Sequence, residues 1–316
     1  RGSGSCAGRV AERAAHRPDV HAAARRDHDA RVAVPGPPAD ATRGESPSPC
    51  PLTRENPVLL VIDVGNTQTV VGLYDEGDRS HELIDHWRLA THAERTSDEL
   101  TLTFRHLLET RELDLVRDVK GVAVSSGVPA VTFELRSMCD RYLEVDPVIV
   151  GTGVRTGMPV LYENPREVGP DRIANAVGAF DLYGGPTIVV DFGTATTFDV
   201  ISEKGEYLGG AIFPGIEISM DALFDHAAAL RRVELSEPRS VIGRTTMESV
   251  QSGAVYGYSA MVDGMCDRIE EVIGESTILA TGGLASLISP VAESIQHEEP
   301  WLTLHGLRLI WEKNRT

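Results

Sequence analysis

The sequence predicts an α/β fold of two similar halves, each with a mixed β-sheet flanked by helices, which face each other across a cleft. Two observations support this prediction. Residues 58–74 read as a buried strand, a tight polar turn with the sequence Asp-x-Gly at Asp63, and a returning strand. Residues 187–201 repeat the pattern, with a second Asp-x-Gly turn at Asp191. Two such hairpins in one chain indicate a duplicated unit.

The first turn contains groups that bind phosphate and cations. Its backbone N–H groups, the Asp63 carboxylate and the Thr67 hydroxyl lie within five residues of chain. Gly65 has no Cβ, so a phosphate could approach its backbone closely. A turn without any ligand is the alternative, since Gly-Asn is common in hairpins. The second copy at Asp191 favours the ligand-binding interpretation.

Composition limits the classes of partner. A chain of 316 residues suggests one or two domains with a substantial core. Its net charge of −17 argues against nucleic acid or an anionic membrane surface as the main partner. Small anionic ligands are still compatible with this charge, because local backbone N–H groups and single arginines can bind them.

The cysteines have no paired spacing. Cys6, Cys50, Cys139 and Cys266 are far apart, so neither a disulfide framework nor a zinc site is indicated. We expect Cys139 and Cys266 to be small buried side chains in a reducing compartment. No apolar run approaches the roughly 18 residues that span a bilayer. We therefore expect a soluble, cytoplasmic protein.

The first 57 residues differ from the rest of the chain. They are rich in Ala, Arg, Pro and Gly without lasting periodicity, which predicts a disordered N-terminal extension over 1–57. A transit peptide is the alternative, but acidic residues such as Asp19 count against it. The first methionine is Met138, and we expect Val58 to mark the natural start through a non-AUG codon. N-terminal sequencing of the native protein tests this hypothesis, and a terminus near Arg1 would contradict it.

The other segments read as alternating strands and helices. A helix should begin at Thr96, where Thr96 and Glu99 have the spacing of a capping box. A strand over 277–281 leads into Gly282 and Gly283, a turn against which a flat ring could lie. The other predicted elements are strands at 86–90, 122–125, 148–150 and 209–216, a helix that includes Leu135 and Met138, and helices from Pro170, from Met220 to Leu230 and over 247–273. The last segment, over 302–314, should pack its apolar residues against the body of the protein.

The box Gly169-Pro170-Asp171-Arg172 has two interpretations. In the structural one, Asp171 compensates the dipole of the helix that starts here and Arg172 forms a surface ion pair. In the functional one, Asp171 is a base for a substrate hydroxyl, and the planar guanidinium of Arg172 binds a carboxylate. The residues alone leave both open.

Five motifs in a fixed order closely resemble those of type III pantothenate kinases. This family belongs to the superfamily of actin-like proteins, sugar kinases and heat-shock chaperone ATPases. The resemblance covers about residues 58–315 and implies two duplicated ribonuclease-H-like (actin-like ATPase) domains, over 58–180 and 181–316, with a nucleotide cleft between them. The motifs are Asp63-Val-Gly-Asn-Thr67, Gly169-Pro-Asp-Arg172, Asp191-Phe-Gly-Thr-Ala-Thr-Thr-Phe-Asp199, Gly209-Gly-Ala-Ile-Phe-Pro-Gly215 and Ala280-Thr-Gly-Gly-Leu-Ala285.

The resemblance implies ATP-dependent phosphorylation of pantothenate to 4'-phosphopantothenate, the first step of coenzyme A synthesis. It implies a homodimer that uses Mg²⁺ with ATP and a monovalent cation, K⁺ or NH₄⁺. Asp171 would be the general base and Asp191 would bind the monovalent cation. The ATP-binding residues would be Asp63, Val64, Gly65, Asn66, Thr67, Gln68, Thr69, Val70 and Thr194; the pantothenate-binding residues would be Tyr162, Gly169, Pro170, Asp171, Arg172 and Thr246.

Three positions depart from the family pattern, and two other functions are alternatives. Pro170, Thr245 and Arg231 stand where alanine, asparagine and proline are usual, which bears on affinity more than on reaction type. Another small-molecule kinase of the superfamily, such as a sugar kinase, is disfavoured by the Gly-x-Asp-Arg box. A nucleotide-binding regulator without turnover is disfavoured because the carboxylates that catalysis needs are present.

Overall fold

The computed structural model describes residues 57–76, 82–227 and 229–315. The N-terminal extension, with Cys6 and Cys50, lies outside these residues, and its predicted disorder stays a prediction. Within the described ranges, no helix is long and apolar enough to cross a membrane. Cys139 and Cys266 are buried free thiols, as predicted.

The first sheet has five strands in the order β3-β2-β1-β4-β5. The central strand β1 pairs antiparallel with β2, which pairs antiparallel with β3. On its other side β1 pairs parallel with β4, and β4 with β5. The strands are β1 (Val58–Val64), β2 (Gln68–Asp75), β3 (Leu83–Ala90), β4 (Val119–Ser126) and β5 (Val148–Ile149).

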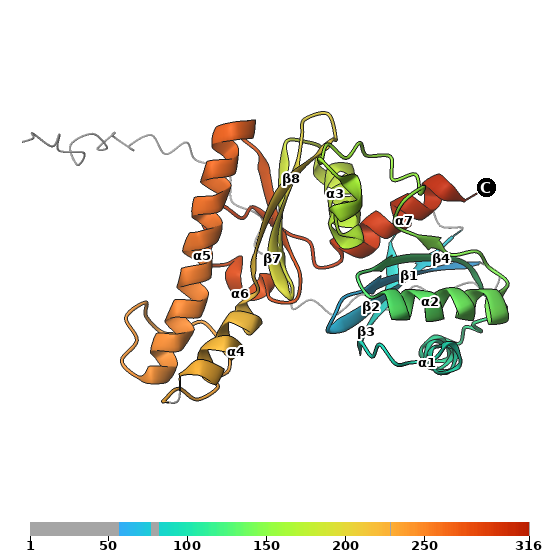
Figure 1. The fold of residues 1–316 in the computed structure, drawn as a ribbon, viewed down its shortest axis with the longest axis horizontal. Coiled ribbons are helices and arrows are strands. Elements are labelled where there is room, and N and C mark those ends of the chain that lie inside the picture. The colour runs from blue at the N-terminus through green and yellow to red at the C-terminus, as the bar shows by residue number, and fades with distance from the viewer. Residues whose placement is uncertain (1–56, 77–81, 228, 316) are drawn as a thin grey trace, which may run out of the picture. The chain divides into compact units, whose positions relative to one another are not determined.

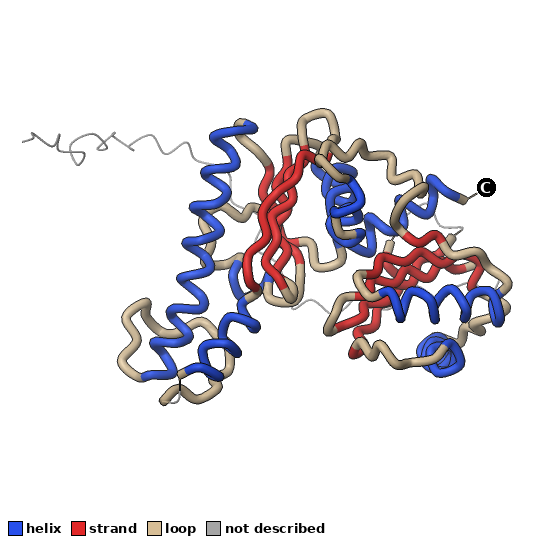
Figure 2. Tube along the Cα trace, in the orientation of Figure 1, coloured by secondary structure: helices blue, strands red, loops and turns tan. Residues whose placement is uncertain are grey.

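The second sheet repeats this arrangement, as Figure 2 lets the reader follow. Its order β8-β7-β6-β9-β10 has two antiparallel pairs on one side of β6 and two parallel pairs on the other. Each strand has a counterpart in the first sheet, so the predicted duplicated fold with mixed sheets is confirmed. The strands are β6 (Thr187–Phe192), β7 (Ala195–Ile201), β8 (Tyr207–Pro214), β9 (Thr277–Thr281) and β10 (His297–Glu298).

Helices cover both faces of each sheet (Figure 1). Helices α1 and α2 pack on one face of the first sheet, and α5 and α6 pack on one face of the second. Helices α3 and α7 pack against each other and against the remaining faces. The helices are α1 (Ser97–Glu109), α2 (Pro129–Met138), α3 (Pro170–Tyr183), α4 (Ile216–His226), α5 (Thr246–Ile273), α6 (Ala285–Ile288) and α7 (Leu302–Asn314), with a π-helix at Cys139–Leu143 and a 3₁₀-helix at Pro165–Glu167.

Strand β1 shows why a continuous apolar run suits the centre of such a sheet. Successive side chains of a strand point to opposite faces. Leu59 and Val61 pack in the cluster with α3 and α7, whereas Leu60 and Ile62 pack in the cluster with α1 and α2. Because both faces are covered by helices, every residue of the run is buried.

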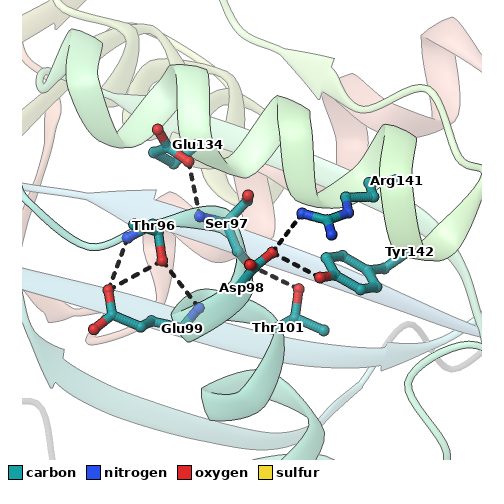
Figure 3. Close-up of polar contacts among 8 residues, drawn as sticks. All are labelled: Thr96, Ser97, Asp98, Glu99, Thr101, Glu134, Arg141 and Tyr142. Atoms are coloured by element: carbon teal, nitrogen blue, oxygen red, sulfur yellow. Dashed lines mark hydrogen bonds and ion pairs between the residues drawn. The ribbon is translucent and has the colours of Figure 1, made fainter.

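The start of α1 is closed by local and long-range polar contacts (Figure 3). The Thr96 side chain accepts a hydrogen bond from the Glu99 N–H at 3.4 Å, and Glu99 Oε2 accepts one from the Thr96 N–H at 2.9 Å. The predicted capping box is therefore confirmed. Asp98 Oδ1 accepts hydrogen bonds from Arg141 at 2.8 Å and from Tyr142 at 2.6 Å, which tie α1 to the π-helix after α2.

Predicted and observed boundaries differ at several elements. Strand β3 starts at Leu83 rather than at His86, and β4 is longer at both ends than 122–125. Helix α4 ends at His226, so Leu230 lies beyond the helix that was expected to contain it. The predicted boundary between the halves, at 180, falls inside α3 and stays a prediction.

Candidate active site

A cleft of about 420 Å³ lies between the two sheets' hairpins. It is lined by the β1–β2 turn, the β6–β7 turn, the glycine turn after β9 and the start of α7. Of the predicted site residues, the following line the cleft: Asp63, Gly65, Asn66, Thr67, Gln68, Val70, Asp171, Asp191 and Thr194.

The two hairpin tips meet across the cleft. Thr67 Oγ1 and Thr194 Oγ1 lie 3.5 Å apart. Each turn is closed by a backbone hydrogen bond, from Gly65 N–H to the Gln68 carbonyl at 2.9 Å and from Gly193 N–H to the Ala195 carbonyl at 3.0 Å. Two tips with exposed hydroxyls therefore converge on one small volume.

The tips also offer backbone donors. Within the described part of the chain, the N–H groups of Asn66, Thr67 and Thr194 donate to no protein acceptor. All three residues are solvent-exposed at the cleft. Consecutive N–H groups of this kind form a concave anion site. The predicted phosphate chemistry thus has donors available in both halves.

Val64 and Thr69 support the first turn from behind rather than lining the cleft. Both are buried. Thr69 Oγ1 lies 2.8 Å from Thr91 Oγ1, and the Thr91 hydroxyl donates to the Gly65 carbonyl at 2.8 Å. These contacts hold the turn against the end of β3. Their effect on a ligand would therefore be indirect.

Three of the carboxylates that line the cleft influence one another's pKa. Asp63 and Asp191 are the penultimate residues of the equivalent strands β1 and β6, and Asp171 lies in the first turn of α3. The pKa of Asp63 is raised to about 7, first by burial and then by the charge of Asp171. The pKa of Asp191 is raised to about 7 by burial and then by Asp171, although Asn175 donates a hydrogen bond to Asp191 at 2.9 Å.

This cluster suits hard cations. A positive charge near Asp63 and Asp191 would relieve both the burial cost and the repulsion that raise their pKa values. Carboxylate oxygens are also ligands that Mg²⁺ accepts, usually together with waters and substrate phosphates. In the ranges that the structure describes, no three acidic, histidine or cysteine side chains form a metal site by themselves. A cation here would need further oxygen ligands, such as those of a phosphate.

Asp171 presents its carboxylate to the cleft. It is exposed, and its Oδ1 accepts a hydrogen bond from the Arg172 N–H at 2.9 Å. The carboxylate also lies directly over Gly169, where an added Cβ would clash with Oδ1. A larger residue at position 169 would therefore displace the Asp171 carboxylate from its observed position.

Arg172 is held below the cleft surface. Its side chain is buried, Nε donates to Asp199 Oδ1 at 2.7 Å, and Nη2 donates to the Phe198 carbonyl at 3.0 Å. Tyr207 donates to the same Asp199 oxygen at 2.8 Å. Burial raises the pKa of Asp199 to about 6, opposed by Arg172. The geometry makes Arg172 an anchor of α3 on β7, and its predicted contact with pantothenate stays a prediction.

Three further predicted residues lie outside the cleft lining. Tyr162 is exposed and packs beside Gly209, and Pro170 is the first residue of α3. Thr246 is exposed at the first residue of α5, where Thr245 caps the helix by accepting a hydrogen bond from Glu248 N–H at 3.1 Å. The structure does not bring Thr246 together with the cleft of its own chain.

Several cleft residues were missed by sequence reasoning. Arg88, Glu217, Trp301 and Thr303 line the cleft alongside the expected Gly282–Gly283 turn. Trp301 also contacts His86 of β3, with ring centroids 3.8 Å apart. The only signal for Arg88 was its place in a predicted strand next to the first hairpin. Trp301 and Thr303 carried none, because their neighbours come from distant segments.

Comparisons with known proteins identify the family. Residues 59–268 match the family described as Type III pantothenate kinase. A type III pantothenate kinase of Streptomyces griseus is 50% identical over 265 residues, covering 81% of this chain and 98% of that protein. One from Anaeromyxobacter sp. is 54% identical over 259 residues, covering 82% and 100%.

A solved structure shares the fold. The putative Baf family transcriptional activator of Campylobacter jejuni has a TM-score of 0.52 and 17% identity, with coverage of 81% of this chain and 98% of that one. At this identity the likeness concerns the fold alone. Together with the family match over residues 59–268, the comparisons show that this chain belongs to the type III pantothenate kinase family.

Proposed function

We propose that this protein transfers the γ-phosphoryl group of ATP to the primary hydroxyl of pantothenate, the first step of coenzyme A synthesis, with Asp171 as the general base. The observation that carries the proposal is the convergence of two phosphate-type hairpins and three carboxylates, Asp63, Asp171 and Asp191, on one cleft. Family membership supplies the reaction and its substrates.

The cleft contains what phosphoryl transfer requires. The reaction needs little covalent work from the protein, so catalysis comes from alignment and charge stabilisation. Backbone donors at Asn66, Thr67 and Thr194 are available for phosphate oxygens. Asp171, exposed at the cleft, would accept the proton of the pantothenate hydroxyl as that oxygen attacks phosphorus.

Asp63 and Asp191 would hold the cations. Their raised pKa values indicate sites where a positive charge is favourable. We assign Asp191 to a monovalent cation, K⁺ or NH₄⁺, and expect Mg²⁺ to enter with ATP. When bound, these cations supply charge neutralisation for the phosphates. We also propose a cytoplasmic location, because the reaction needs a supply of ATP.

The direct test is an assay with ATP, pantothenate, Mg²⁺ and K⁺ that detects phosphopantothenate. We expect turnover with pantothenate and none with a panel of sugars. Omission of K⁺ and NH₄⁺ should lower the rate, and the Asp191→Asn variant should lose this cation dependence. ATP binding without transfer to pantothenate would instead favour a regulator of the same fold.

A homodimer would reconcile the predicted role of Thr246 with its position outside the cleft lining. Thr246 is expected to bind pantothenate, yet it lies away from the cleft of its own chain. Exposed apolar side chains occur on β8, on α4, in the segment before α5 and at the start of α5: Ile212, Phe213, Ile218, Val241, Ile242 and Met247. We assign this surface to a second copy of the chain, which would bring Thr246 of one protomer to the pantothenate site of its partner.

Mixed dimers test this arrangement. Asp171→Asn and Thr246→Ala homodimers should both be impaired. Mixing the two after mild dissociation should restore activity, because one site in each mixed dimer then combines an intact Asp171 with an intact Thr246. An unchanged activity after mixing, with exchange verified by differently tagged chains, would place both residues in one protomer's site.

A further inference from the structure

One cleft residue differs from the others in charge. Asp63, Asp171, Asp191 and Glu217 bring four carboxylates to the lining, and Arg88 is the only lysine or arginine that lines the cleft in the described ranges. A nucleoside triphosphate is strongly anionic. Its binding beside four carboxylates is unfavourable unless cations offset the charge repulsion. Among the described residues, Arg88 is the one cation that the protein provides there.

Strand alternation directs Arg88 to this face. Arg88 lies on β3 opposite Val70 of β2. Trp87 and Leu89 on either side of it pack against the core between the first sheet and α1 and α2. Arg88 and His86 are exposed on the other face, where His86 contacts the cleft residue Trp301. Alternate side chains of a strand point to opposite faces, and one face of β3 is buried. Arg88 therefore lies on the exposed face.

The guanidinium reaches both halves of the protein. Nη1 donates a hydrogen bond to Gln68 Oε1 of the first hairpin at 3.0 Å. The same atom lies 3.4 Å from the position that a Cβ would take on Gly283, in the turn after β9. Among the residues that the structure describes, Arg88 forms no ion pair with a carboxylate. Most of its five N–H donors are therefore available to a ligand.

We propose that Arg88 is an ATP-binding residue whose guanidinium contacts the triphosphate between the first hairpin and the Gly282–Gly283 turn. The proposal rests on the proposed function, because it requires ATP in this cleft. A planar guanidinium fork suits phosphate oxygens and makes charge-assisted hydrogen bonds to them. The bond to Gln68 orients the fork in advance, which lowers the entropic cost of binding.

The same contact would join the two halves around the nucleotide. Arg88 is anchored in the first sheet, and Gly283 belongs to the second. A phosphate bound between them would contact both. We therefore expect Arg88 to contribute to ATP affinity more than to pantothenate affinity.

Direct binding measurements test the assignment. ATP, ADP and uncharged adenosine are titrated into wild type, Arg88→Met, Arg88→Lys and the control Arg141→Gln, which removes the same charge outside the cleft. Arg88→Met should weaken ATP binding about 10- to 100-fold, the range of a charged hydrogen bond. Adenosine binding should stay within about 2-fold, and Arg88→Lys should recover part of the loss because it keeps the charge. The control should bind ATP like the wild type.

Two results would overturn the proposal. The first is an unchanged ATP affinity in Arg88→Met; the second is an equal loss for ATP and adenosine, which indicates a structural role. Thermal melting of each variant shows whether it is folded. Failure of the proposed function would give another result: the wild type would bind ATP without phosphorylating pantothenate. The Arg88 variants would still show whether Arg88 contributes to ATP binding.

Discussion

Thr67 Oγ1 and Thr194 Oγ1 lie 3.5 Å apart, although 127 residues of chain separate them. Each hydroxyl stands at the tip of an equivalent hairpin, one from each five-stranded sheet. The contact therefore marks the point where the duplicated halves come together, at the cleft proposed to hold ATP.

We expect Thr67→Ala and Thr194→Ala each to raise the KM for ATP roughly 10- to 100-fold, the cost of one hydrogen bond to a charged group. The double variant should lose less than the sum of the two free-energy changes, since groups in contact couple. Steady-state kinetics measure this cycle. Thr103→Ala, on α1 away from the cleft, serves as the control. Strict additivity would show that the two hydroxyls act on separate ligands.

Asp171→Asn should lower kcat by about 100-fold or more, the range of general-base catalysis, while ATP still binds. The amide keeps the shape of the side chain but cannot accept the hydroxyl proton. The measurement is kcat together with the dissociation constant of ATP, with the exposed Asp140→Asn as the matched control. A near-normal kcat would remove Asp171 from this role.

Asp63→Asn should stabilise the protein when ATP and cations are absent. The pKa of Asp63 is raised to about 7 in the folded state from an ordinary value of 3.8, mainly by burial. The unfolded chain therefore loses this proton first, and the folded state becomes less stable as pH rises from about 4 to about 7. Above that window the full cost remains, on the order of a few kcal/mol.

Urea unfolding at pH 4.5 and pH 8 checks this pH dependence. Asp63→Asn should be more stable than the wild type at pH 8, and the gain should shrink strongly at pH 4.5. The same variant should be a poor enzyme, because it lacks a carboxylate that is proposed to hold a cation. The carboxylate thus costs stability when no cation is bound but is needed for activity. An equal gain at both pH values would contradict the assignment of the gain to ionisation.

Asp199→Asn should destabilise the fold by about 3 to 5 kcal/mol, because it leaves the buried guanidinium of Arg172 without its carboxylate. Tyr207→Phe removes only one hydrogen bond to Asp199 and should cost about 1 kcal/mol. The free energy of unfolding in urea measures both. The double variant Asp199→Asn, Arg172→Met should recover much of the stability that Asp199→Asn loses. A double variant that is less stable still would contradict the pairing of Arg172 with Asp199.

Features set by neighbouring residues were predicted from the sequence. The capping box at Thr96 and Glu99 and both Asp-x-Gly hairpins appear in the structure. Their signals are local, since a cap, a turn or an amphipathic period depends on residues within one or two turns of chain. Boundaries were less well predicted, as at Leu83 and Leu230, because tertiary contacts extend or end an element.

The duplicated fold, the family and the two hairpins could all be predicted from the order of residues. Only the tertiary structure showed that Arg172 pairs with the buried Asp199, that Thr246 lies away from the cleft, and that Arg88 stands between Gln68 and Gly283. The difference comes from the distance along the chain over which each interaction acts. Backbone propensity and apolar period act between near neighbours, whereas the partner of a charged side chain is chosen by the packing of segments far apart in the chain.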